Sequence, residues 1–399
     1  MTTLHESLVQ REARVFCHTY GRYPLSISHA AGTRLFDLDG KTYVDLLAGI
    51  AVVNLGHCRP ELSRVMAEQA QRLVHVSNLF YQEQQVVLAE KLVSTCHAQR
   101  VFLCNSGAEA NEAAVKLARR YMQKRRGRDA FEIITLQGSF HGRTLAMIAA
   151  TGQDRIKDGF APMPQGFVSV PWNDLGAMEQ AIGPQTAGIL VEMVQGEGGV
   201  RPMSQDYASG LQALCREKDI LFMVDEIQTG LGRTGSFWAF QGYGLAPDIF
   251  TSAKGLANGL PAGAMLTTEE VAAGFEPGAH ASTFGGGPVV AAVASKVLDL
   301  LQEEKLAERA ARVGAYAMGQ FAGLKDEFPD KIADVRGRGL LLGIELTFPA
   351  QPVWKGLLEQ GFVLNCTQER VLRLLPPLTI DIADIDDFTA TLRTLLASC

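Results

Sequence analysis

The sequence predicts an α/β fold in two parts, a large domain with a mostly parallel sheet and a smaller α+β domain. Three observations lead to this prediction. The chain has 399 residues, which is long for one compact domain. Short apolar runs alternate with helical segments through the first two thirds of the chain. After Gly287 the pattern changes to long helices followed by short strands.

The first segment, residues 1–54, contains a hairpin signal. Asp39 and Gly40 stand between two short strand-like runs. An Asp-Gly pair favours the tight turn that joins two antiparallel strands. We expect this segment to pack with the C-terminal domain instead of forming a unit of its own.

The middle of the chain, residues 55–287, should form the large domain. Its expected strands are almost continuously apolar, as is typical of a parallel sheet that is covered on both faces. They are Arg100–Cys104, Glu132–Leu136, Gly188–Met193, Ile220–Val224 and Ile249–Ser252. Helical segments such as Glu109–Lys124 and Tyr207–Lys218 lie between them.

The last part, residues 288–399, should form the smaller domain. Two long helices are expected first, at Val289–Glu304 and Leu306–Phe321. Short strands follow, and a final helix ends the chain. The strands are Gly339–Leu346, Phe362–Leu364 and Val371–Leu374, and the helix is Ile385–Leu396.

The composition argues against several classes of partner. A net charge of -6 gives no electrostatic attraction to nucleic acid or an anionic membrane. The one basic run, at residues 124–128, is interpreted as a solvated helix end. No apolar run could span a bilayer, and residues 1–14 lack the apolar core of a secretory signal. Seven scattered cysteines without a C-x-x-C pair argue against a disulfide framework or a zinc site. We expect a cytoplasmic protein without a metal.

A small turn at Ser106, Gly107 and Ala108 joins a predicted strand to a predicted helix. The unpaired N–H groups and the positive dipole end of a helix N-terminus suit a phosphate. The alternative is a plain helix cap made by Ser106.

A second turn carries Phe140, His141 and Arg143. The two rings are candidates for stacking on a planar cofactor, and Arg143 is a candidate for binding a carboxylate through two hydrogen bonds. The alternative is a turn bounded by glycines around a buried Phe.

An acidic residue, Asp225, directly follows a wholly apolar strand. It should therefore lie at the carboxyl edge of the sheet, where open α/β folds bind ligands. A carboxylate there needs a positive partner, and a pyridinium nitrogen would be one. The alternatives are a helix cap and a structural ion pair.

A lysine, Lys254, follows another apolar strand and is flanked by small residues. A confined lysine can have its pKa lowered and become a nucleophile for an aldehyde, although most lysines lie on the surface. Further along, Ser282 and Thr283 precede three glycines and could cradle a phosphate. The alternative for that stretch is a flexible loop between domains.

Together these elements supply a phosphate cradle, a ring stacker, an acid for a ring nitrogen and a nucleophilic lysine. Those are the parts of a pyridoxal-phosphate (PLP) site. The segment from Phe222 to Gly263 also resembles the signature of the class III (ω-amino acid) aminotransferases, with DEIQTGLGRTG, then PDI, then SAKGLANGLPAGAM. HVSNLFY, LCNSGAEANEAAVKLARR, GSFHGRT and STFGG resemble the members that act on N-acetylornithine. The resemblance runs from about Phe36 to the C-terminus. It departs at Ala281, where the family often has Gly, and at Gly287, where it often has Asn.

The resemblance implies the PLP-dependent transferase fold type I, like that of aspartate aminotransferase, and a role for each matching residue. Lys254 would form the Schiff base and shuttle a proton, and Asp225 would pair with the ring nitrogen. The implied cofactor contacts are Ser106, Gly107, Ala108, Phe140, Asp225, Glu226, Ile227, Gln228, Lys254 and Thr283. Gln228 would contact the ring hydroxyl, and Thr283 would reach the cofactor of the other subunit, so that two copies form a homodimer with shared sites.

The resemblance also implies the substrates. Arg143 and Ser282 would bind the substrate, and Glu197 and Arg373 would be a paired switch that lets one site accept two substrates. The implied reaction moves the terminal amine of N-acetylornithine to 2-oxoglutarate in arginine biosynthesis, and succinyl-diaminopimelate is an implied second amine donor. The alternatives are another ω-aminotransferase, for ornithine, succinylornithine or 4-aminobutyrate, and an aminomutase or racemase on the same scaffold.

Overall fold

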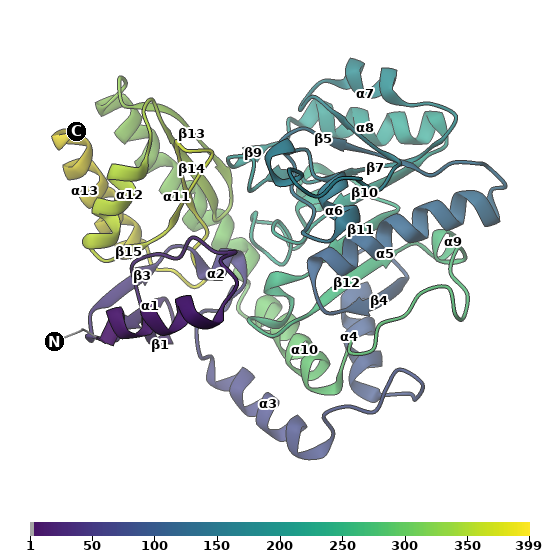
Figure 1. Cartoon of the computed structure of the whole chain (residues 1–399), viewed down its shortest axis with the longest axis horizontal. Helices are drawn as coiled ribbons and strands as arrows, with labels where there is room; N and C mark the ends of the chain where they lie inside the picture. The colour runs from purple at the N-terminus through teal and green to yellow at the C-terminus, as the bar shows by residue number, and fades with distance from the viewer. Residues whose placement is uncertain (1–3) are drawn as a thin grey trace.

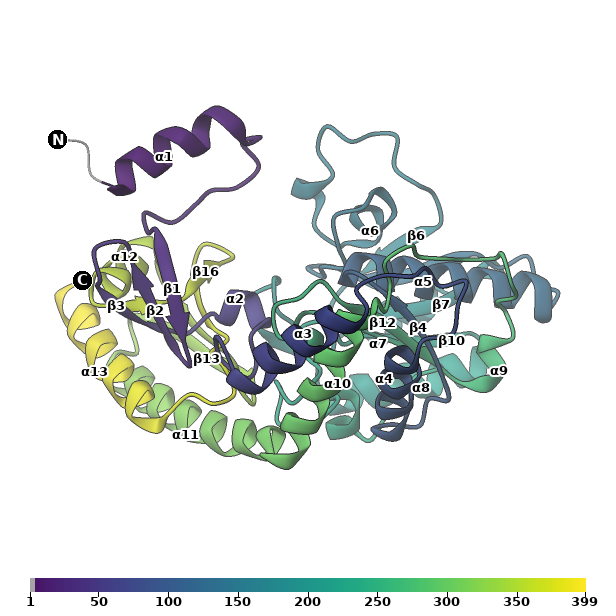
Figure 2. The ribbon, with the colours of Figure 1, turned by 90° about the horizontal axis from the view of Figure 1, so that it is seen from below.

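The computed structural model describes residues 4–399, which form two lobes connected by a long helical stretch (Figures 1 and 2). The larger lobe is built on a seven-stranded sheet with the order β4-β12-β11-β10-β7-β5-β6. Its strands are β4 (Arg100–Cys104), β5 (Glu132–Leu136), β6 (Phe167–Val170), β7 (Thr186–Val191), β10 (Leu221–Asp225), β11 (Ile249–Ser252) and β12 (Gly263–Thr267).

This sheet is mostly parallel, which confirms the predicted fold class. β7 pairs in parallel with β5 and β10, and β10 pairs in parallel with β11. Only β12 runs against its neighbours β11 and β4. We did not predict β12, because it follows Gly259 and Pro261 and that stretch is typical of a loop.

Helices cover both faces of the large sheet (Figure 2). α5 packs against β11 and β12, and its buried side consists largely of alanines, which permit a close approach. The helices of this lobe are α3 (Pro60–Arg72), α4 (Glu83–Ser94), α5 (Gly107–Arg120), α6 (Leu145–Ala150), α7 (Leu175–Ala181), α8 (Gln205–Lys218), α9 (Glu269–Ala272) and α10 (Pro288–Glu303). A short hairpin of β8 (Val194–Gln195) and β9 (Arg201–Pro202) faces the other lobe.

Several expected elements have other bounds in the structure, and two of these differences affect the site described below. The strand expected over Gly188–Met193 ends at Val191. The helix expected over Glu109–Lys124 begins at Gly107, because the side chain of Ser106 caps it by accepting the N–H of Glu109 at 3.2 Å. Its last residues, Tyr121–Arg125, form a wider π-helical turn.

The smaller lobe contains an antiparallel sheet with the order β13-β14-β17-β16. The predicted strand Val371–Leu374 is present as β17. The strand expected from Gly339 starts at Leu341, because Gly339 has a φ of +57° in the turn before it. The elements are α11 (Leu306–Glu327), β13 (Ile332–Arg338), β14 (Leu341–Leu346), α12 (Gln351–Glu359), β15 (Phe362–Val363), β16 (Asn365–Thr367), β17 (Val371–Leu374) and α13 (Ile382–Ser398).

The N-terminal segment lies against the C-terminal part of the chain. Its elements are α1 (Leu4–Val15), β1 (Ile27–Ala31), β2 (Arg34–Asp37), β3 (Thr42–Asp45) and α2 (Ala48–Ala51). β2 and β3 form the hairpin predicted at Gly40, and β3 pairs in parallel with β15. Arg34 forms an ion pair with Asp384 at 2.6 Å. The division into residues 1–54, 55–287 and 288–399 stays a prediction.

Among residues 4–399, no helix has both the length and the apolar character that crossing a membrane requires.

Candidate active site

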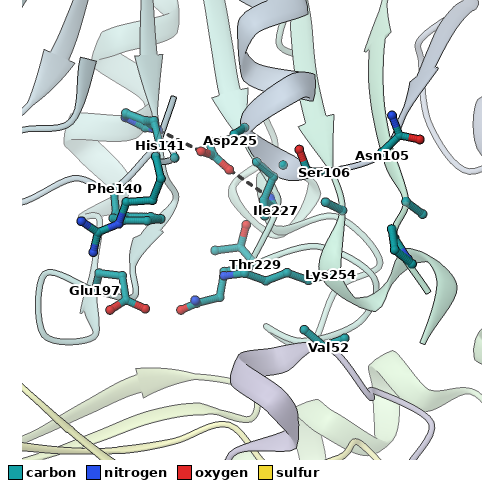
Figure 3. Close-up of a pocket in the computed structure, with 18 of the residues that line it drawn as sticks. Val52, Asn105, Ser106, Phe140, His141, Glu197, Asp225, Ile227, Thr229 and Lys254 are labelled. Atoms are coloured by element: carbon teal, nitrogen blue, oxygen red, sulfur yellow. Dashed lines mark hydrogen bonds and ion pairs between the residues drawn. The ribbon is translucent and has the colours of Figure 1, made fainter. Parts of the chain in front are cut away.

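A cavity of about 450 Å³ opens at the carboxyl edge of the large sheet (Figure 3). Five parallel strands, β4, β5, β7, β10 and β11, end at this edge, and each delivers a lining residue at or shortly after its last position. These residues are Asn105, Phe140, Glu192, Asp225 and Lys254. Val52 of the N-terminal segment closes the cavity from the side of the smaller lobe. The position agrees with the general rule for ligand sites in open α/β sheets.

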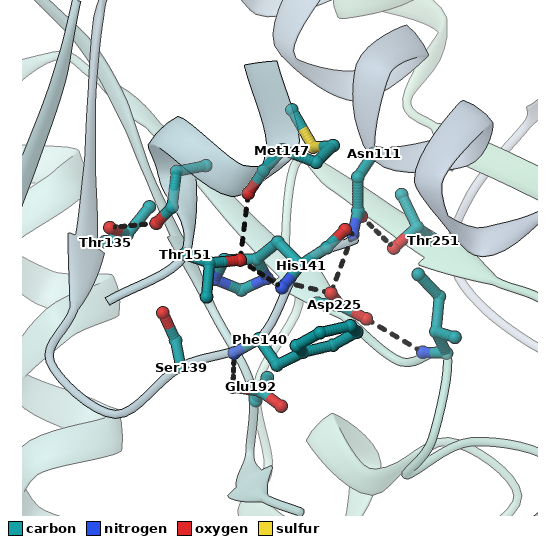
Figure 4. Close-up of polar contacts among 12 residues, drawn as sticks. Asn111, Thr135, Ser139, Phe140, His141, Met147, Thr151, Glu192, Asp225 and Thr251 are labelled. Atoms are coloured by element: carbon teal, nitrogen blue, oxygen red, sulfur yellow. Dashed lines mark hydrogen bonds and ion pairs between the residues drawn. The ribbon is translucent and has the colours of Figure 1, made fainter. Parts of the chain in front are cut away.

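Asp225 is held by three hydrogen bonds at the end of β10 (Figure 4). Its Oδ2 accepts from His141 Nδ1 at 2.8 Å and from Asn111 Nδ2 at 2.8 Å, and its Oδ1 accepts the N–H of Ile227 at 3.0 Å. The residue is only 4% exposed. Both oxygens are therefore satisfied by the large lobe alone, and the carboxylate is fixed beside the cavity.

We did not assign this supporting role to His141 and Asn111 from the sequence. His141 was a candidate for ring stacking, yet it is buried and directs Nδ1 at Asp225. Asn111 is fully buried on the alanine-rich side of α5, where its Oδ1 accepts from Thr251 Oγ1 at 2.7 Å. A lone amide on an otherwise apolar helix face is the signal that could have indicated it.

Lys254 points into the cavity from the turn after β11 (Figure 3). Its φ of +45° is a left-handed conformation, which costs a non-glycine residue about 1–3 kcal/mol and is typical of functional positions. Burial lowers the pKa of Lys254, and Arg373 lowers it further against the opposing charges of Glu197 and Asp225. A lowered pKa increases the share of the free amine, which is the nucleophilic form.

The N-terminus of α5 forms one wall of the cavity through Ser106, Gly107 and Ala108. Ser106 uses its side chain to cap the helix, so the predicted cap and the predicted anion site coexist. The N–H groups of the first turn have no carbonyl partner inside a helix and are available to an anion. A Cβ on Gly107 would lie 2.7 Å from Cδ1 of Ile227, so a glycine is needed there.

Phe140 lines the cavity, and a buried carboxyl group holds its main chain. Glu192 Oε2 accepts the N–H of Phe140 at 3.1 Å (Figure 4). Burial, and then the charge of Asp225, raise the pKa of Glu192 well above its ordinary value. We missed Glu192 because the predicted strand ran to Met193 and placed it inside the strand. Arg143 is exposed at the rim, with its guanidinium 5.4 Å from the centre of the Phe140 ring.

Gln228 and Glu226, which follow Asp225 in the sequence, point in different directions. Gln228 lines the cavity, and its Oε1 is buried without a hydrogen-bond donor among the described residues. Glu226 turns away from the cavity: its oxygens accept from Thr229 Oγ1 at 2.6 Å and from the N–H of Phe240 at 2.8 Å. The side chain of Glu226 therefore does not reach the cavity, and the cofactor contact expected at Glu226 stays a prediction.

Glu197 and Arg373 meet across the two lobes, as the motifs suggested. Arg373 Nη1 donates to Glu197 Oε1 at 2.6 Å. Arg373 is fully buried, whereas the side chain of Glu197 is 31% exposed. Burial alone would raise the pKa of Glu197, but Arg373 and Lys254 hold it below its ordinary value. Arg373 Nη2 has no acceptor among the described residues, so the guanidinium keeps a free donor.

Ser282 and Thr283 do not line this cavity. They lie in a neighbouring hollow with Ser77, Asn78 and Leu79. Ser282 Oγ caps its own loop by accepting the N–H of Gly285 at 3.0 Å, and Thr283 is exposed. Within one chain, then, the structure brings together the predicted site residues other than Glu226, Ser282 and Thr283.

The arrangement combines a primary amine of lowered pKa, a fixed carboxylate, an anion site at a helix end and a flat aromatic ring. Such a set can bind a phosphorylated aromatic aldehyde and form a covalent bond to it. An arginine at the rim and a second arginine behind Glu197 provide two positions for carboxylates.

The sequence is similar to those of known proteins. The family described as aminotransferase class-III matches residues 15–396. The acetylornithine aminotransferase of Methanothermobacter thermautotrophicus is 44% identical over 381 residues, which cover 96% of this chain and 96% of that protein. The acetylornithine aminotransferase of Thermosynechococcus vestitus is 46% identical over 394 residues, which cover 96% of this chain and 95% of that protein.

Solved structures share the fold over the whole chain. The ornithine aminotransferase of Toxoplasma gondii ME49 superposes with a TM-score of 0.96 at 33% identity, covering 99% of this chain and 96% of that chain. The acetylornithine aminotransferase of Elizabethkingia anophelis superposes with a TM-score of 0.89 at 31% identity, covering 100% of both chains. The prediction of fold type I is therefore confirmed.

Proposed function

The chain belongs to the class-III aminotransferase family, whose cofactor is PLP, and from that premise we propose that it transfers the terminal amine of N-acetylornithine to 2-oxoglutarate. The products are N-acetylglutamate semialdehyde and glutamate, in arginine biosynthesis. Relatives named for this activity are 42–46% identical over almost their whole length. The structural observation that carries the proposal is one cavity that holds both the strained Lys254 and a carboxylate, Glu197, whose partner Arg373 retains a free donor.

The cavity fits PLP. The phosphate of PLP could accept the first-turn N–H groups at Gly107 and Ala108. The pyridine ring of PLP could stack on the face of Phe140, and its ring nitrogen could pair with Asp225. The buried Oε1 of Gln228, which lacks a donor in the described chain, suits the ring hydroxyl. When bound, PLP supplies an electron sink that stabilises negative charge on the substrate carbon.

Lys254 holds the cofactor and moves the proton. Its amine is largely removed from water, and the lowered pKa favours the free base. Once substrate has displaced it, Lys254 Nζ is placed to take a proton from the substrate carbon that bears the amine and to return it later. Asp225 stays fixed throughout, because all three of its hydrogen bonds come from the same lobe.

Arg143 receives the α-carboxylate of N-acetylornithine. Its guanidinium lies at the exposed rim, next to the ring of Phe140. A chain of methylene groups can span from that rim toward Lys254, so the terminal amine points inward. A planar fork of donors suits a carboxylate better than a single ammonium group does.

The pair of Glu197 and Arg373 lets the same cavity accept two substrates. N-acetylornithine carries no carboxylate beside its reacting amine, so Glu197 masks the charge of Arg373 while it is bound. Glutamate carries a carboxylate on the reacting carbon, and this group replaces Glu197 as the partner of Arg373. The partly exposed Glu197 side chain is free to leave, and the free Nη2 of Arg373 gives the incoming carboxylate a second donor. The competing explanation is a salt bridge that only holds the lobes together.

A homodimer is the proposed active unit. Apolar side chains gather on two adjoining loops at residues 77–81 and 282–285, where Leu79 is 87% exposed, Tyr81 is fully exposed and Phe284 is 66% exposed. Asn78 Nδ2 joins the loops by donating to the carbonyl oxygens of Ser282 and Gly285. An apolar patch of this kind is typical of a protein interface. Thr283 is exposed within this patch. In the proposed dimer, Thr283 contacts the cofactor of the second copy and Ser282 contacts the substrate of the second copy.

Sedimentation should show a dimer, and a fully active PLP-bound monomer would contradict this proposal.

A cytoplasmic location belongs to the same proposal. All seven cysteines are free thiols, as a reducing compartment favours. Fractionation of cells with an antibody to the chain tests it, and recovery from an oxidising compartment would refute it.

A panel of amine donors tests the substrate most directly, with 2-oxoglutarate as the acceptor. N-acetylornithine should give the highest kcat/KM, and succinyl-diaminopimelate is the second donor to be measured. A higher value for ornithine, succinylornithine or 4-aminobutyrate would reassign the substrate, and the likeness to an ornithine aminotransferase structure makes ornithine the main rival. Turnover without 2-oxoglutarate would indicate an aminomutase or racemase, since an isomerase needs no second substrate.

A further inference from the structure

We propose that Asn365 is a positioning residue that holds Arg373 in place while Glu197 and the substrate carboxylate exchange. This inference rests on the switch proposed above and assigns a new residue to it. Arg373 Nε donates to Asn365 Oδ1 at 3.0 Å. The same guanidinium donates to Glu197 through Nη1 and has a free Nη2.

The three donor positions divide the guanidinium into two edges. Asn365 accepts from Nε on the lateral edge of the guanidinium, so the end formed by Nη1 and Nη2 is left for a carboxylate. Nη1 donates to Glu197, and Nη2 has no acceptor among the described residues. When Glu197 leaves, a substrate carboxylate can therefore accept hydrogen bonds from both Nη1 and Nη2, in the bidentate geometry that arginine favours.

The contact with Asn365 does not depend on the other lobe. Asn365 on β16 is the direct cross-strand partner of Arg373 on β17, so both belong to one antiparallel sheet. Glu197 comes from the large lobe, shortly after β8. Arg373 thus has one partner that travels with it and one that can depart. This matters because Arg373 is fully buried, and a buried guanidinium without any partner is costly.

The main chain of Glu197 is also anchored by β16 and the residue after it. Its carbonyl oxygen accepts from Thr367 Oγ1 at 2.8 Å and from Gln368 Nε2 at 2.9 Å. Only the side chain of Glu197 is then left to move, and the exchange needs no displacement of the backbone.

An amide suits this position better than a carboxylate. A neutral acceptor satisfies Nε and leaves the full positive charge of Arg373 for either Glu197 or the substrate. An aspartate at the same position would neutralise that charge permanently and would compete with the substrate carboxylate.

The test compares Asn365→Ala and Asn365→Asp with Cys366→Ala, a neighbouring change on the same strand. Affinity is measured by calorimetry with two unreactive probes, glutarate for the dicarboxylate substrates and N-acetylnorvaline for N-acetylornithine without its terminal amine. Asn365→Ala should weaken glutarate binding about tenfold or more, the loss expected for a hydrogen bond to a charged group. Asn365→Asp should also weaken glutarate binding, because its carboxylate neutralises Arg373 and competes with the substrate carboxylate. N-acetylnorvaline binding should change less than about threefold, because Glu197 still masks Arg373. Cys366→Ala should change neither.

A rescue experiment separates positioning from a structural role. In Glu197→Ala the charge of Arg373 is unmasked, and the stopped-flow half-reaction with N-acetylornithine should slow. Adding Asn365→Asp to that variant restores a negative partner from the other edge and should recover most of this half-reaction. Equal losses with both probes in Asn365→Ala, or no recovery in the double variant, would overturn the role of Asn365. If Asn365→Ala does not fold, Asn365→Asp, which preserves the shape and the acceptor, decides with the same measurements. A parallel loss of both half-reactions in Glu197→Ala alone would instead refute the switch.

Discussion

Asp225 and Glu197 are carboxylates that line the same cavity, yet the molecule holds them in different ways. Asp225 is 4% exposed, and both of its oxygens accept hydrogen bonds from the large lobe. The Glu197 side chain is 31% exposed, and its ion pair reaches across to Arg373 in the other lobe. The hydrogen bonds of Asp225 all come from the large lobe, whereas the pair of Glu197 and Arg373 leaves Nη2 of Arg373 without an acceptor among the described residues.

This difference separates a fixed task from an exchangeable one. A group that must stay beside the cofactor through every step gains from partners that do not move. A group that must give way to a substrate needs a partner that can accept a replacement at little cost. The degree of hydrogen-bond satisfaction, more than the charge itself, therefore indicates which of the two carboxylates is permanent.

The largest expected effect lies at Lys254, which lines the same cavity as the two carboxylates. Lys254→Ala should lose turnover by about 10³-fold or more, because no other amine among the described lining residues can move the proton. PLP should still be retained through the helix end and Asp225. Borohydride reduction of the parent protein followed by peptide mapping should label Lys254, and a label on another lysine would end the assignment.

The role of Asp225 can be tested by removing its charge while keeping the shape of its side chain. Asp225→Asn should lower kcat by about 10²- to 10³-fold, the usual loss when a preorganised charge at a reacting centre is removed. Both half-reactions should fall together, since Asp225 serves each of them. Single-turnover rates check this, and an unchanged rate in either half-reaction would remove Asp225 from its role.

The rim arginine should affect one substrate more than the other. Arg143→Lys keeps the charge but loses the planar fork, and it should weaken N-acetylornithine binding by about 1.5–3 kcal/mol, or about 10- to 100-fold. The affinity for N-acetylnorvaline measures this without turnover. Equal affinity in the variant and the parent would show that another group holds the α-carboxylate.

A neighbour of Asp225 gives a matched control for the fixed region. Burial raises the pKa of Glu226 to about 7, and its oxygens bind Thr229 and Phe240 instead of lining the cavity. The folded chain then binds this proton more tightly than the unfolded chain, so the contribution to stability falls as the pH rises from about 4.5 to about 7 and stays low above that.

Glu226→Gln should remove that loss and leave kcat nearly unchanged. The gain in free energy of unfolding of the variant over the parent should be larger at pH 8 than at pH 5, by up to about 3 kcal/mol. Denaturant titration of both proteins at both pH values measures it. A large fall in kcat with unchanged stability would mean that Glu226 acts in the site after all.

Much of this site was predictable because its signals are local. A strand of apolar residues followed at once by Asp225 or Lys254 places those side chains at the carboxyl edge of a parallel sheet. The helix start at Ser106 likewise follows from residue types next to one another in the sequence. The fold class rests on the same apolar runs and helical periods.

The rest depends on contacts between distant segments or on side-chain direction. Asn111 and His141 reach Asp225 from two other elements, and no local pattern pairs them. Glu192 was hidden by a strand end misplaced by two residues. Glu226 follows Asp225 directly, but successive side chains along an extended chain point to opposite sides, so a shared motif did not give a shared role.

The proposed exchange of Glu197 for a substrate carboxylate at Arg373 is tested most directly by stopped-flow measurement of each half-reaction in Glu197→Ala. The half-reaction with glutamate should be kept or improved, because Arg373 is then always free for the substrate carboxylate. The half-reaction with N-acetylornithine should slow by about tenfold, since an ion pair that masks a buried charge is lost. A parallel fall in both half-reactions, together with lower stability, would show that Glu197 and Arg373 only join the lobes and would contradict the switch.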